Sequence, residues 1–245
     1  MKTILLIHGQ WVGKWIWDGV IWEITQNEEK KYSGEIVVPC LPGHGLNSSY
    51  DRRRITTDHY VESSVTEVQV KQLVDVTVVV HSFAASYLSR IINQIKESVK
   101  RVVVIGGLIP CMGKSVFEFL PVRRRFGTRL FGPVEKGIAP PAHLRRKLMA
   151  HRKEESLVSE PYLPWVEPFN DSYYPDNIDF EYIVLGKDDI FDRRLQLKAA
   201  SRLPNVVTSE IEANFLGPLT HSKEIGRIIL GKGSDMVGRN GSKSN

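Results

Sequence analysis

The sequence predicts one α/β domain, in which a mostly parallel central sheet is flanked by helices and carries an inserted helical cap. Short runs rich in Val and Ile alternate with stretches of helical length, the pattern of a sheet covered by helices on both faces. The runs are apolar almost throughout, as expected for strands that are buried on both sides. With 245 residues, of which 42% are hydrophobic, the chain is long enough to form one core.

Six strands and five helices are expected from these runs. The strands cover residues 3–8, 35–39, 75–81, 101–106, 180–185 and 206–211, and the helices cover residues 15–25, 57–73, 83–99, 194–202 and 222–230. The interval 110–178 breaks the alternation, because it is rich in Pro, Arg and aromatic residues and has no clear central strand. We therefore expect a core at 1–110 and 179–230, a helical cap at 111–178 and a disordered tail at 231–245.

The composition excludes several classes of protein. The formal net charge is +5, but the basic residues are scattered, so no nucleic-acid partner is predicted. Cys40 and Cys111 form neither a CxxC motif nor a disulfide framework, which favours a reducing compartment. No apolar run is long enough to cross a membrane, and we expect a soluble, cytoplasmic protein. Because no zinc-spaced Cys/His cluster, P-loop or GxGxxG motif occurs, no metal or organic cofactor is expected.

A candidate nucleophile, Ser82, lies where a predicted strand meets a predicted helix. An apolar run leads into His81, Ser82 and Phe83, and a helical pattern follows directly. This context is typical of a nucleophile elbow, in which a Ser on a strained turn projects its hydroxyl into a cleft. The Phe83 N–H is then expected to face an oxyanion. The usual GxSxG pattern has Val80 and Ala84 in place of Gly, and a Ser that merely caps the helix is the alternative interpretation.

A second group of candidates, His8-Gly9-Gln10-Trp11, follows the first predicted strand. Gly9 allows the backbone to turn and expose an N–H toward the same cleft, so Gln10 is expected to provide the second oxyanion donor. The spacing of the aromatic residues in this region indicates core or cleft wall; these residues are Trp11, Trp15, Trp17 and Trp22.

A third motif is the tight turn PGHG at residues 42–45, after the second predicted strand. Together and in this order, the motifs resemble the α/β-hydrolase superfamily over nearly all of residues 1–230. The stretches HGQWVGKWIW and LPGHGLNS and the small cap are similar to the branch that holds plant hydroxynitrile lyases, plant methyl-ester esterases and related bacterial esterases. The resemblance implies an α/β-hydrolase fold, a Ser82 nucleophile, and oxyanion donors at Gln10 and Phe83. It assigns His81 a packing and hydrogen-bonding role.

The acid of a catalytic triad is expected after the penultimate strand, where the sequence has two adjacent carboxylates, Asp188 and Asp189. Counting from the strand and from the next helix favours Asp188, whereas counting from Gly186 favours Asp189. Asp188 ranks ahead, and both stay candidates. A structural alternative is that an Asp at this place caps the next helix.

The base of the triad is missing from its expected place. The resemblance implies a His after the last strand, in a stretch like GHFGPLTHP, and residues 214–222 here read NFLGPLTHS, which puts Phe215 at that position. A phenyl ring cannot accept a proton, and a Ser hydroxyl is a weak nucleophile without an adjacent base. His221 is the first substitute, although it matches the family's second His at the start of the last helix. The other substitutes are His143 and His151 in the cap and His44 and His81 on the cleft wall.

Two functions compete on this evidence. The first is a carboxylic ester hydrolase, in which Ser82 attacks the ester, an imidazole takes the proton and one of the two carboxylates orients the imidazole. The second is a catalytically silenced relative that binds a small hydrophobic or carboxylate ligand in the same cleft, which Val80 and Phe215 favour. A lyase that reuses the oxyanion hole ranks third. In each case the partner is a small molecule, and its expected contacts are Gln10, Trp11, Phe83 and Phe215.

Overall fold

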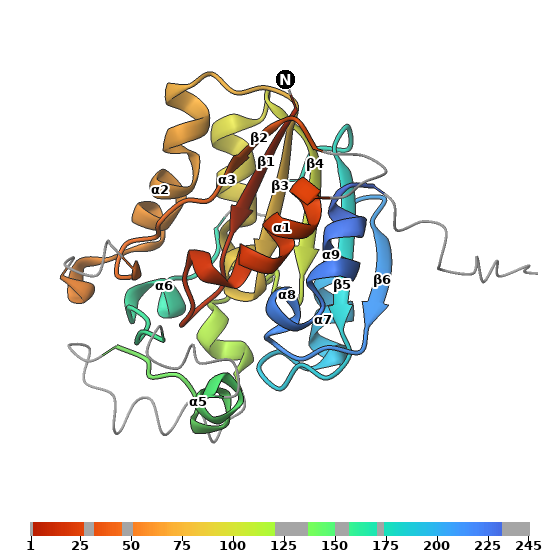
Figure 1. Cartoon of the computed structure of the whole chain (residues 1–245). Helices are drawn as coiled ribbons and strands as arrows, with labels where there is room; N and C mark the ends of the chain where they lie inside the picture. The colour runs from red at the N-terminus through yellow and green to blue at the C-terminus, as the bar shows by residue number, and fades with distance from the viewer. Residues whose placement is uncertain are drawn as a thin grey trace, which may run out of the picture.

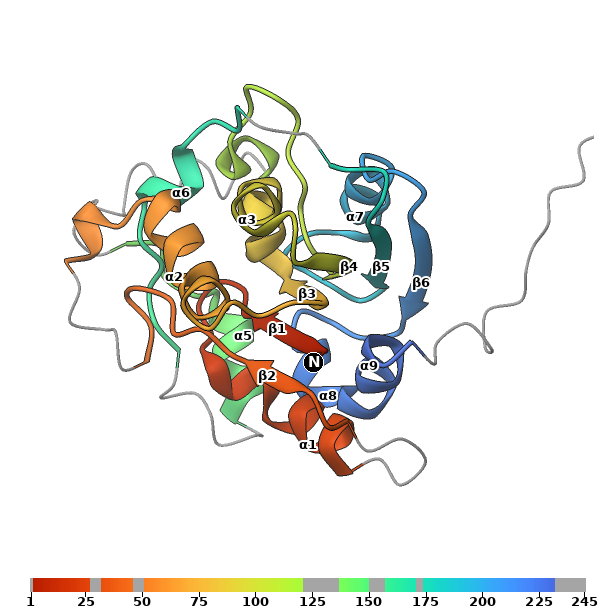
Figure 2. The same cartoon turned by 90° about the horizontal axis from the view of Figure 1, so that it is seen from above.

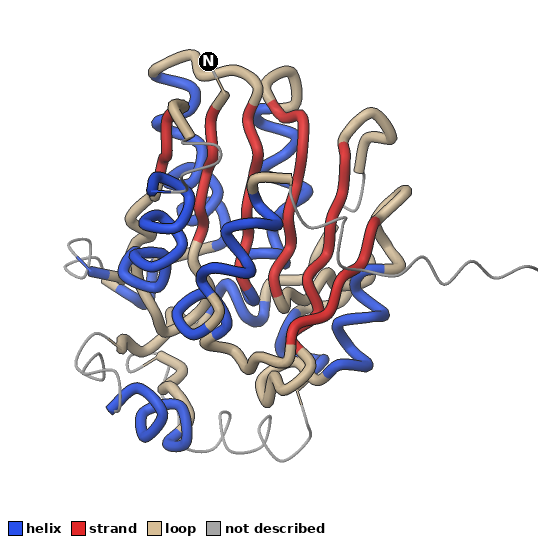
Figure 3. Tube along the Cα trace, turned by 45° about the vertical axis from the view of Figure 1, so that its right-hand side comes forward, coloured by secondary structure: helices blue, strands red, loops and turns tan. Residues whose placement is uncertain are grey.

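The computed structural model describes residues 2–26, 32–45, 51–120, 137–149, 157–170 and 174–231. Its sheet has the strand order β2-β1-β3-β4-β5-β6, and each neighbouring pair is parallel (Figures 1 and 3). This confirms the predicted fold class. The strands are β1 (Thr3–Ile7), β2 (Glu35–Val37), β3 (Val76–His81), β4 (Val99–Ile105), β5 (Asp179–Leu185) and β6 (Val207–Ile211).

Helices cover both faces of the sheet (Figure 2). One face carries α1 (Asp18–Gln26), α8 (Gly217–Thr220) and α9 (Ser222–Ile229), and the other carries α2 (Thr57–Val70), α3 (Leu88–Ile95) and α7 (Arg193–Ala200). Four shorter 3₁₀ helices are η1 (Lys14–Trp17), η3 (Arg52–Arg54), η4 (Ser82–Tyr87) and η5 (Val116–Phe119). Because the strands are buried between two helical layers, their β-branched runs are apolar on both sides.

The helix predicted at 83–99 is divided in the structure. Its first residues form the tighter η4, and α3 begins only at Leu88. The apolar side chains of α3 recur at helical spacing and face the core, as the pattern predicts. The helix ends early because the Ser98 carbonyl accepts the Val76 N–H, which places Val99 at the start of β4. The prediction that Val99 is helical was therefore wrong.

Trp22 is the clearest error in the predicted core. Its side chain is 62% exposed, whereas Trp11 and Trp17 are buried. The reason is helical geometry: α1 buries Val20 and Ile24, which are four residues apart, and a residue midway between them points to the opposite side. Trp22 belongs neither to the core nor to a cleft wall.

The described parts of the cap lie at the carboxyl ends of the strands (Figure 1). They contain η5, α5 (Ala142–Met149), α6 (Leu163–Val166) and an antiparallel bridge between Ile138 and Glu160. The predicted division into core and cap stays a prediction, and the tail predicted at 231–245 lies outside the described residues after Gly231. Within the described ranges, no helix is both long enough and apolar enough to cross a membrane.

The strand order indicates where a ligand site is expected. The chain leaves β1, adds β2 on one side and then returns to add β3 on the other side of β1. In a parallel α/β sheet, a crevice forms at the carboxyl ends of the two strands where the order reverses in this way. The segments that follow β1 and β3 hold Gln10 and Ser82, so the topology brings the two predicted motifs together.

Candidate active site

Ser82 occupies the strained turn that the sequence predicts. It ends β3, begins η4 and has a φ of 50°. This left-handed conformation costs a non-glycine residue roughly 1–2 kcal/mol. The Ser82 side chain is buried, and its Oγ has no hydrogen-bond partner among the described residues. A strained serine with an uncommitted hydroxyl is the arrangement expected of a nucleophile elbow.

Gly9 explains how the segment after β1 approaches this turn. A Cβ at Gly9 would lie 2.8 Å from the Nδ1 of His81 and 3.0 Å from the Cβ of Ser82. Only a residue without a side chain allows so close an approach. His81 and Ser82 therefore pack directly against Gly9, and any side chain at this position would clash with them.

Gln10 and Phe83 meet in a way that the sequence did not predict. The two were expected to direct backbone N–H groups at a substrate oxygen, but the Phe83 N–H donates to the side-chain Oε1 of Gln10, at 3.0 Å. The side-chain carbonyl of Gln10 is thus the acceptor for the Phe83 N–H. Its Nε2 is buried without a partner in the described part of the chain. A substrate oxygen that binds the Phe83 N–H has to displace the Gln10 side chain.

Phe215 is buried beside the nucleophile strand. Its ring lies 4.8 Å from the His81 ring and 6.0 Å from the Trp11 ring, measured between centroids. The Phe215 backbone carbonyl accepts a hydrogen bond from His81 Nε2, at 2.9 Å. His81 therefore packs and hydrogen-bonds, as the resemblance implies. Burial lowers the pKa of His81 to about 4, so its imidazole is a weak general base.

The two adjacent aspartates lie in different environments. Asp188 is buried, and its Oδ1 accepts the Ile190 N–H at 2.8 Å. Its Oδ2 has no partner among the described residues. Burial raises the pKa of Asp188 to about 7. Asp189 instead turns to the cap, where its Oδ2 lies 2.9 Å from His143 Nε2 and 3.2 Å from Lys147 Nζ. Of the two candidates, Asp188 is therefore the buried one and Asp189 the one that faces the cap.

The substitute bases do not contact the nucleophile. His221 is half-buried at the start of α9, and its Nδ1 lies 2.8 Å from the Thr220 hydroxyl. His143 faces Asp189 from the cap. His44 is buried against Glu160. His151 lies outside the described residues. No imidazole that the structure describes is hydrogen-bonded to Ser82 Oγ.

Sequence reasoning missed Glu160. This cap residue is buried, and its carboxylate contacts Trp11, His44 and Tyr60. No local pattern marks it, because its partners come from three distant segments of the chain. The one signal that could have pointed to Glu160 was His44, because it lies in a tight turn at the carboxyl edge of the sheet and could pair with a carboxylate there.

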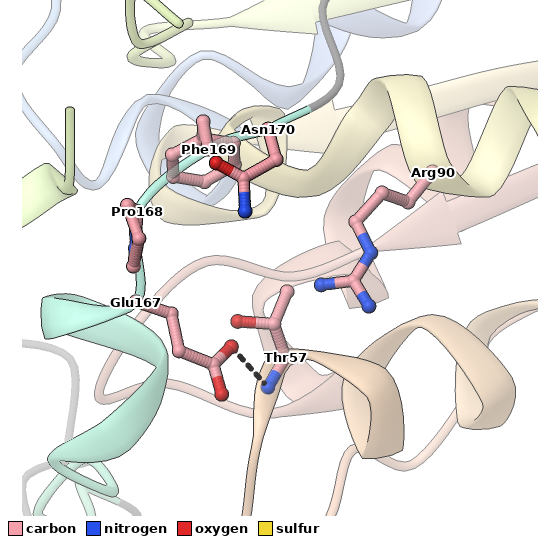
Figure 4. A pocket seen from close by; sticks show the side chains of 6 residues that line it. All are labelled: Thr57, Arg90, Glu167, Pro168, Phe169 and Asn170. Atoms are coloured by element: carbon pink, nitrogen blue, oxygen red, sulfur yellow. Dashed lines mark hydrogen bonds between the residues drawn. The ribbon is translucent and has the colours of Figure 1, made fainter. Parts of the chain in front are cut away.

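A separate hollow of about 270 Å³ lies beside α2 and α3 (Figure 4). There the Thr57 N–H donates to Glu167 Oε2, at 3.1 Å. The guanidinium of Arg90 is paired with Asp58. The residues that line the hollow do not include those of the Ser82 site; they are Thr57, Arg90, Glu167, Pro168, Phe169 and Asn170.

Comparison with known families agrees with the fold. Residues 4–214 match the alpha/beta hydrolase family. The chain belongs to this family. The resemblance that the motifs indicated is thereby confirmed, although no curated protein matches the chain.

Solved structures of this family share the fold at low sequence identity. An extracellular α/β-hydrolase from a Paenibacillus species, described as sharing structural and functional homology with tobacco salicylic acid binding protein 2, has a TM-score of 0.81 at 20% identity, covering 95% of this chain and 99% of that chain. A pyrethroid hydrolase from Sphingobium faniae JZ-2 has a TM-score of 0.72 at 15% identity, with 96% and 98% covered. A histidine-to-alanine variant of tomato methylketone synthase I, complexed with β-ketoheptanoate, has 0.71 at 14%, with 96% and 98% covered.

Proposed function

We propose that this α/β-hydrolase binds a small carboxylic ester at Ser82 and hydrolyses it slowly to the acid and the alcohol, because Phe215 occupies the place of the general base. The elbow at Ser82 and the buried carboxyl of Asp188 supply two of the three members of a catalytic triad. In serine hydrolases, loss of triad members lowers the rate by a factor of about 10⁴–10⁶. The remaining catalysis comes from substrate binding and the oxyanion hole. The proposal is thus a hydrolase site interrupted at one residue.

The observation that carries this proposal is the unpartnered Oδ2 of Asp188. In a complete triad, this oxygen accepts the N–H of the histidine that serves as base. A buried carboxyl oxygen without a donor costs free energy, so an imidazole placed nearby would be expected to bind it. The aromatic contacts of Phe215 with His81 and Trp11 are consistent with a ring that fills the place of the base.

The chemical class of the ligand is suggested by the relatives. One similar structure is a hydrolase of pyrethroids, and another was captured with β-ketoheptanoate, a small keto acid, as a histidine-to-alanine variant. An acyl compound of this size would place its carbonyl oxygen against the Phe83 N–H, where the Gln10 carbonyl now lies. The Gln10 side chain would have to leave the Phe83 N–H for such a compound to bind there.

An ordinary ester hydrolase is the second candidate, and the strain at Ser82 favours it. The chain keeps a positive φ and an unpartnered buried hydroxyl at this position, and both features cost free energy. Such strain typically persists at sites where it serves the reaction. This candidate requires a general base for Ser82 other than the described residues that contact it.

The substitution Phe215→His separates the two candidates. We expect it to raise Ser82-dependent hydrolysis of p-nitrophenyl butyrate, and the labelling rate with a fluorophosphonate probe, by at least about 100-fold, because the imidazole would find both Ser82 and Asp188 in place. The measurements are steady-state hydrolysis and time-resolved labelling followed by mass spectrometry.

Two control variants make this experiment specific. Phe215→Leu removes the ring without adding a base, and we expect no comparable gain from it. Adding Ser82→Ala to Phe215→His should abolish the gain. If the unaltered chain already hydrolyses esters at Ser82 and Phe215→His leaves the rate unchanged, the second candidate is correct and the account of Phe215 is wrong.

A further inference from the structure

Glu160 is a buried carboxylate that contacts three polar groups, the Trp11 N–H, His44 Nε2 and the Tyr60 hydroxyl. It has no exposed surface, and its backbone is held in the bridge with Ile138. Its Oε1 accepts the Trp11 backbone N–H and a hydrogen bond from His44 Nε2, at 2.7 Å. Its Oε2 accepts the Tyr60 hydroxyl at 3.1 Å. An ionised carboxylate accepts all three of these hydrogen bonds at once.

His44 supplies the opposite charge. Its Nε2 faces Glu160, and its Nδ1 lies 3.1 Å from the carbonyl oxygen of Pro42. Opposite an ionised Glu160, both ring nitrogens face acceptors, and an imidazolium donates to both of them. Burial alone would lower the pKa of His44, but the charge and hydrogen bond of Glu160 outweigh it, and the pKa is raised above its ordinary value. Arg52 acts in the opposite direction.

The imidazole and hydroxyl groups beside this pair are neutral. The His8 ring lies 4.9 Å from the His44 ring, and burial followed by the charge of His44 lowers the pKa of His8 well below its ordinary value. Burial and the nearby Glu160 raise the pKa of the Tyr60 and Tyr87 hydroxyls, so both stay protonated. One buried ion pair thus stands among neutral side chains, where a low dielectric strengthens it.

The ion pair holds the segment that carries Gln10. Besides the bond from its N–H to Glu160, Trp11 accepts the Val158 N–H at 3.0 Å and donates its indole N–H to the Ile138 carbonyl at 2.9 Å. The φ of Trp11 is 62°, a conformation that needs such support. The residue directly before it, Gln10, places its side chain on the Phe83 N–H.

We propose that Glu160 is a positioning residue of the Ser82 site, which, charged by its pairing with His44, fixes Trp11 and thereby sets Gln10 against the Phe83 N–H. The inference deepens the proposed function and rests on it for one readout only, the labelling of Ser82. Through this contact, a residue of the cap controls the geometry of a donor in the core.

The test compares Glu160→Gln with Glu167→Gln in the full chain. Glu167 is a matched control, because it also connects the cap to the core, through the Thr57 N–H, but does not contact Trp11 (Figure 4). We expect Glu160→Gln to accelerate amide hydrogen exchange in residues 9–12 by at least about tenfold. Because a loosened Gln10 side chain leaves the Phe83 N–H more readily, we also expect it to raise Ser82 labelling in the Phe215→His background by a similar factor. Glu167→Gln should leave both unchanged.

Two further measurements keep the inference testable. In the unaltered chain at pH 7.5, ¹⁵N NMR should show both nitrogens of His44 protonated; a neutral His44 overturns the proposal even if Glu160→Gln fails to fold. Unchanged exchange at residues 9–12 in folded Glu160→Gln also overturns it. If Phe215→His is not labelled at all, the proposed function fails, while the exchange and NMR results still decide the role of Glu160.

Discussion

Two buried polar clusters lie at the carboxyl edge of the sheet, the Glu160–His44 pair and the residues around Ser82, and the polar atoms of the pair are the more completely hydrogen-bonded. Around Glu160, both carboxylate oxygens and both nitrogens of His44 have partners. Around Ser82, polar atoms without partners recur among the described residues; they are Ser82 Oγ, Asp188 Oδ2, His81 Nδ1 and Gln10 Nε2. The two clusters are connected through the adjacent residues Gln10 and Trp11.

The difference indicates which cluster maintains the structure and which one awaits a partner. An unsatisfied buried polar group costs roughly 1–3 kcal/mol, so a cluster of them persists only where something besides stability selects it. The complete cluster holds the cap to the core. The incomplete cluster is where we place the proposed ligand binding.

The largest effect on stability is expected at the complete cluster, from His44→Ala. This substitution leaves the Glu160 charge buried without its counter-charge, and such a loss typically costs about 3–5 kcal/mol. Urea unfolding at pH 7.5 measures the cost. His221→Ala is the control, because its half-buried ring is expected to contribute no more than about 0.5 kcal/mol. Equal costs for the two variants would contradict the distinction between the clusters.

Most of the fold could be predicted from the sequence, because parallel strands buried on both faces have a strong pattern. The predicted strand 75–81 corresponds to β3, which begins one residue later. Errors occur where tertiary contacts override local preference. Trp22 is a residue type that is common in cores, but it lies on the exposed side of α1. Val99 continues a helical pattern in the sequence, but it is the first residue of β4.

The candidate site was only half predictable. Ser82 and Gln10 could be proposed because a strand-to-turn junction leaves a local signal, and Phe215 because residues 214–222 resemble the family's stretch that carries the His. Glu160 could not be found, since a buried ion pair between the cap and a distant turn depends on three-dimensional contacts alone. The hydrogen bond from the Phe83 N–H to the Gln10 side chain was not expected either, because it too depends on a contact between distant segments of the chain.

A smaller effect is expected at Asp188, and it has a distinctive pH dependence. The pKa of Asp188 is raised to about 7 in the fold, so the folded chain keeps a proton that the unfolded chain releases above about pH 4. The stabilising contribution is full below pH 4 and is lost as the pH rises to 7. We expect Asp188→Asn to flatten this part of the stability curve, by on the order of 3 kcal/mol, in urea unfolding at several pH values.

Comparing Asp188→Asn with the unaltered chain makes this stability measurement specific to Asp188. His81, whose pKa is lowered, contributes a pH dependence of the opposite sign, but it is present in both chains and cancels in their difference. In the Phe215→His background, the restored imidazole should bind Asp188, and Asp188→Asn should then remove the gained activity. A pH dependence that Asp188→Asn does not change would show that this carboxyl is already paired.

The smallest effect is expected at Ser82 itself, where substitution should stabilise the chain. Ser82→Ala removes an unpartnered buried hydroxyl, and we expect a gain of about 1 kcal/mol in the free energy of unfolding. Ser82→Gly additionally relieves the positive φ, so it should at least equal the Ala variant despite the greater chain entropy of Gly. Thermal and urea unfolding of the two variants measure this. If Ser82→Ala destabilises the chain, the hydroxyl has a structural partner, and Ser82 belongs with the complete cluster rather than with a site that awaits a ligand.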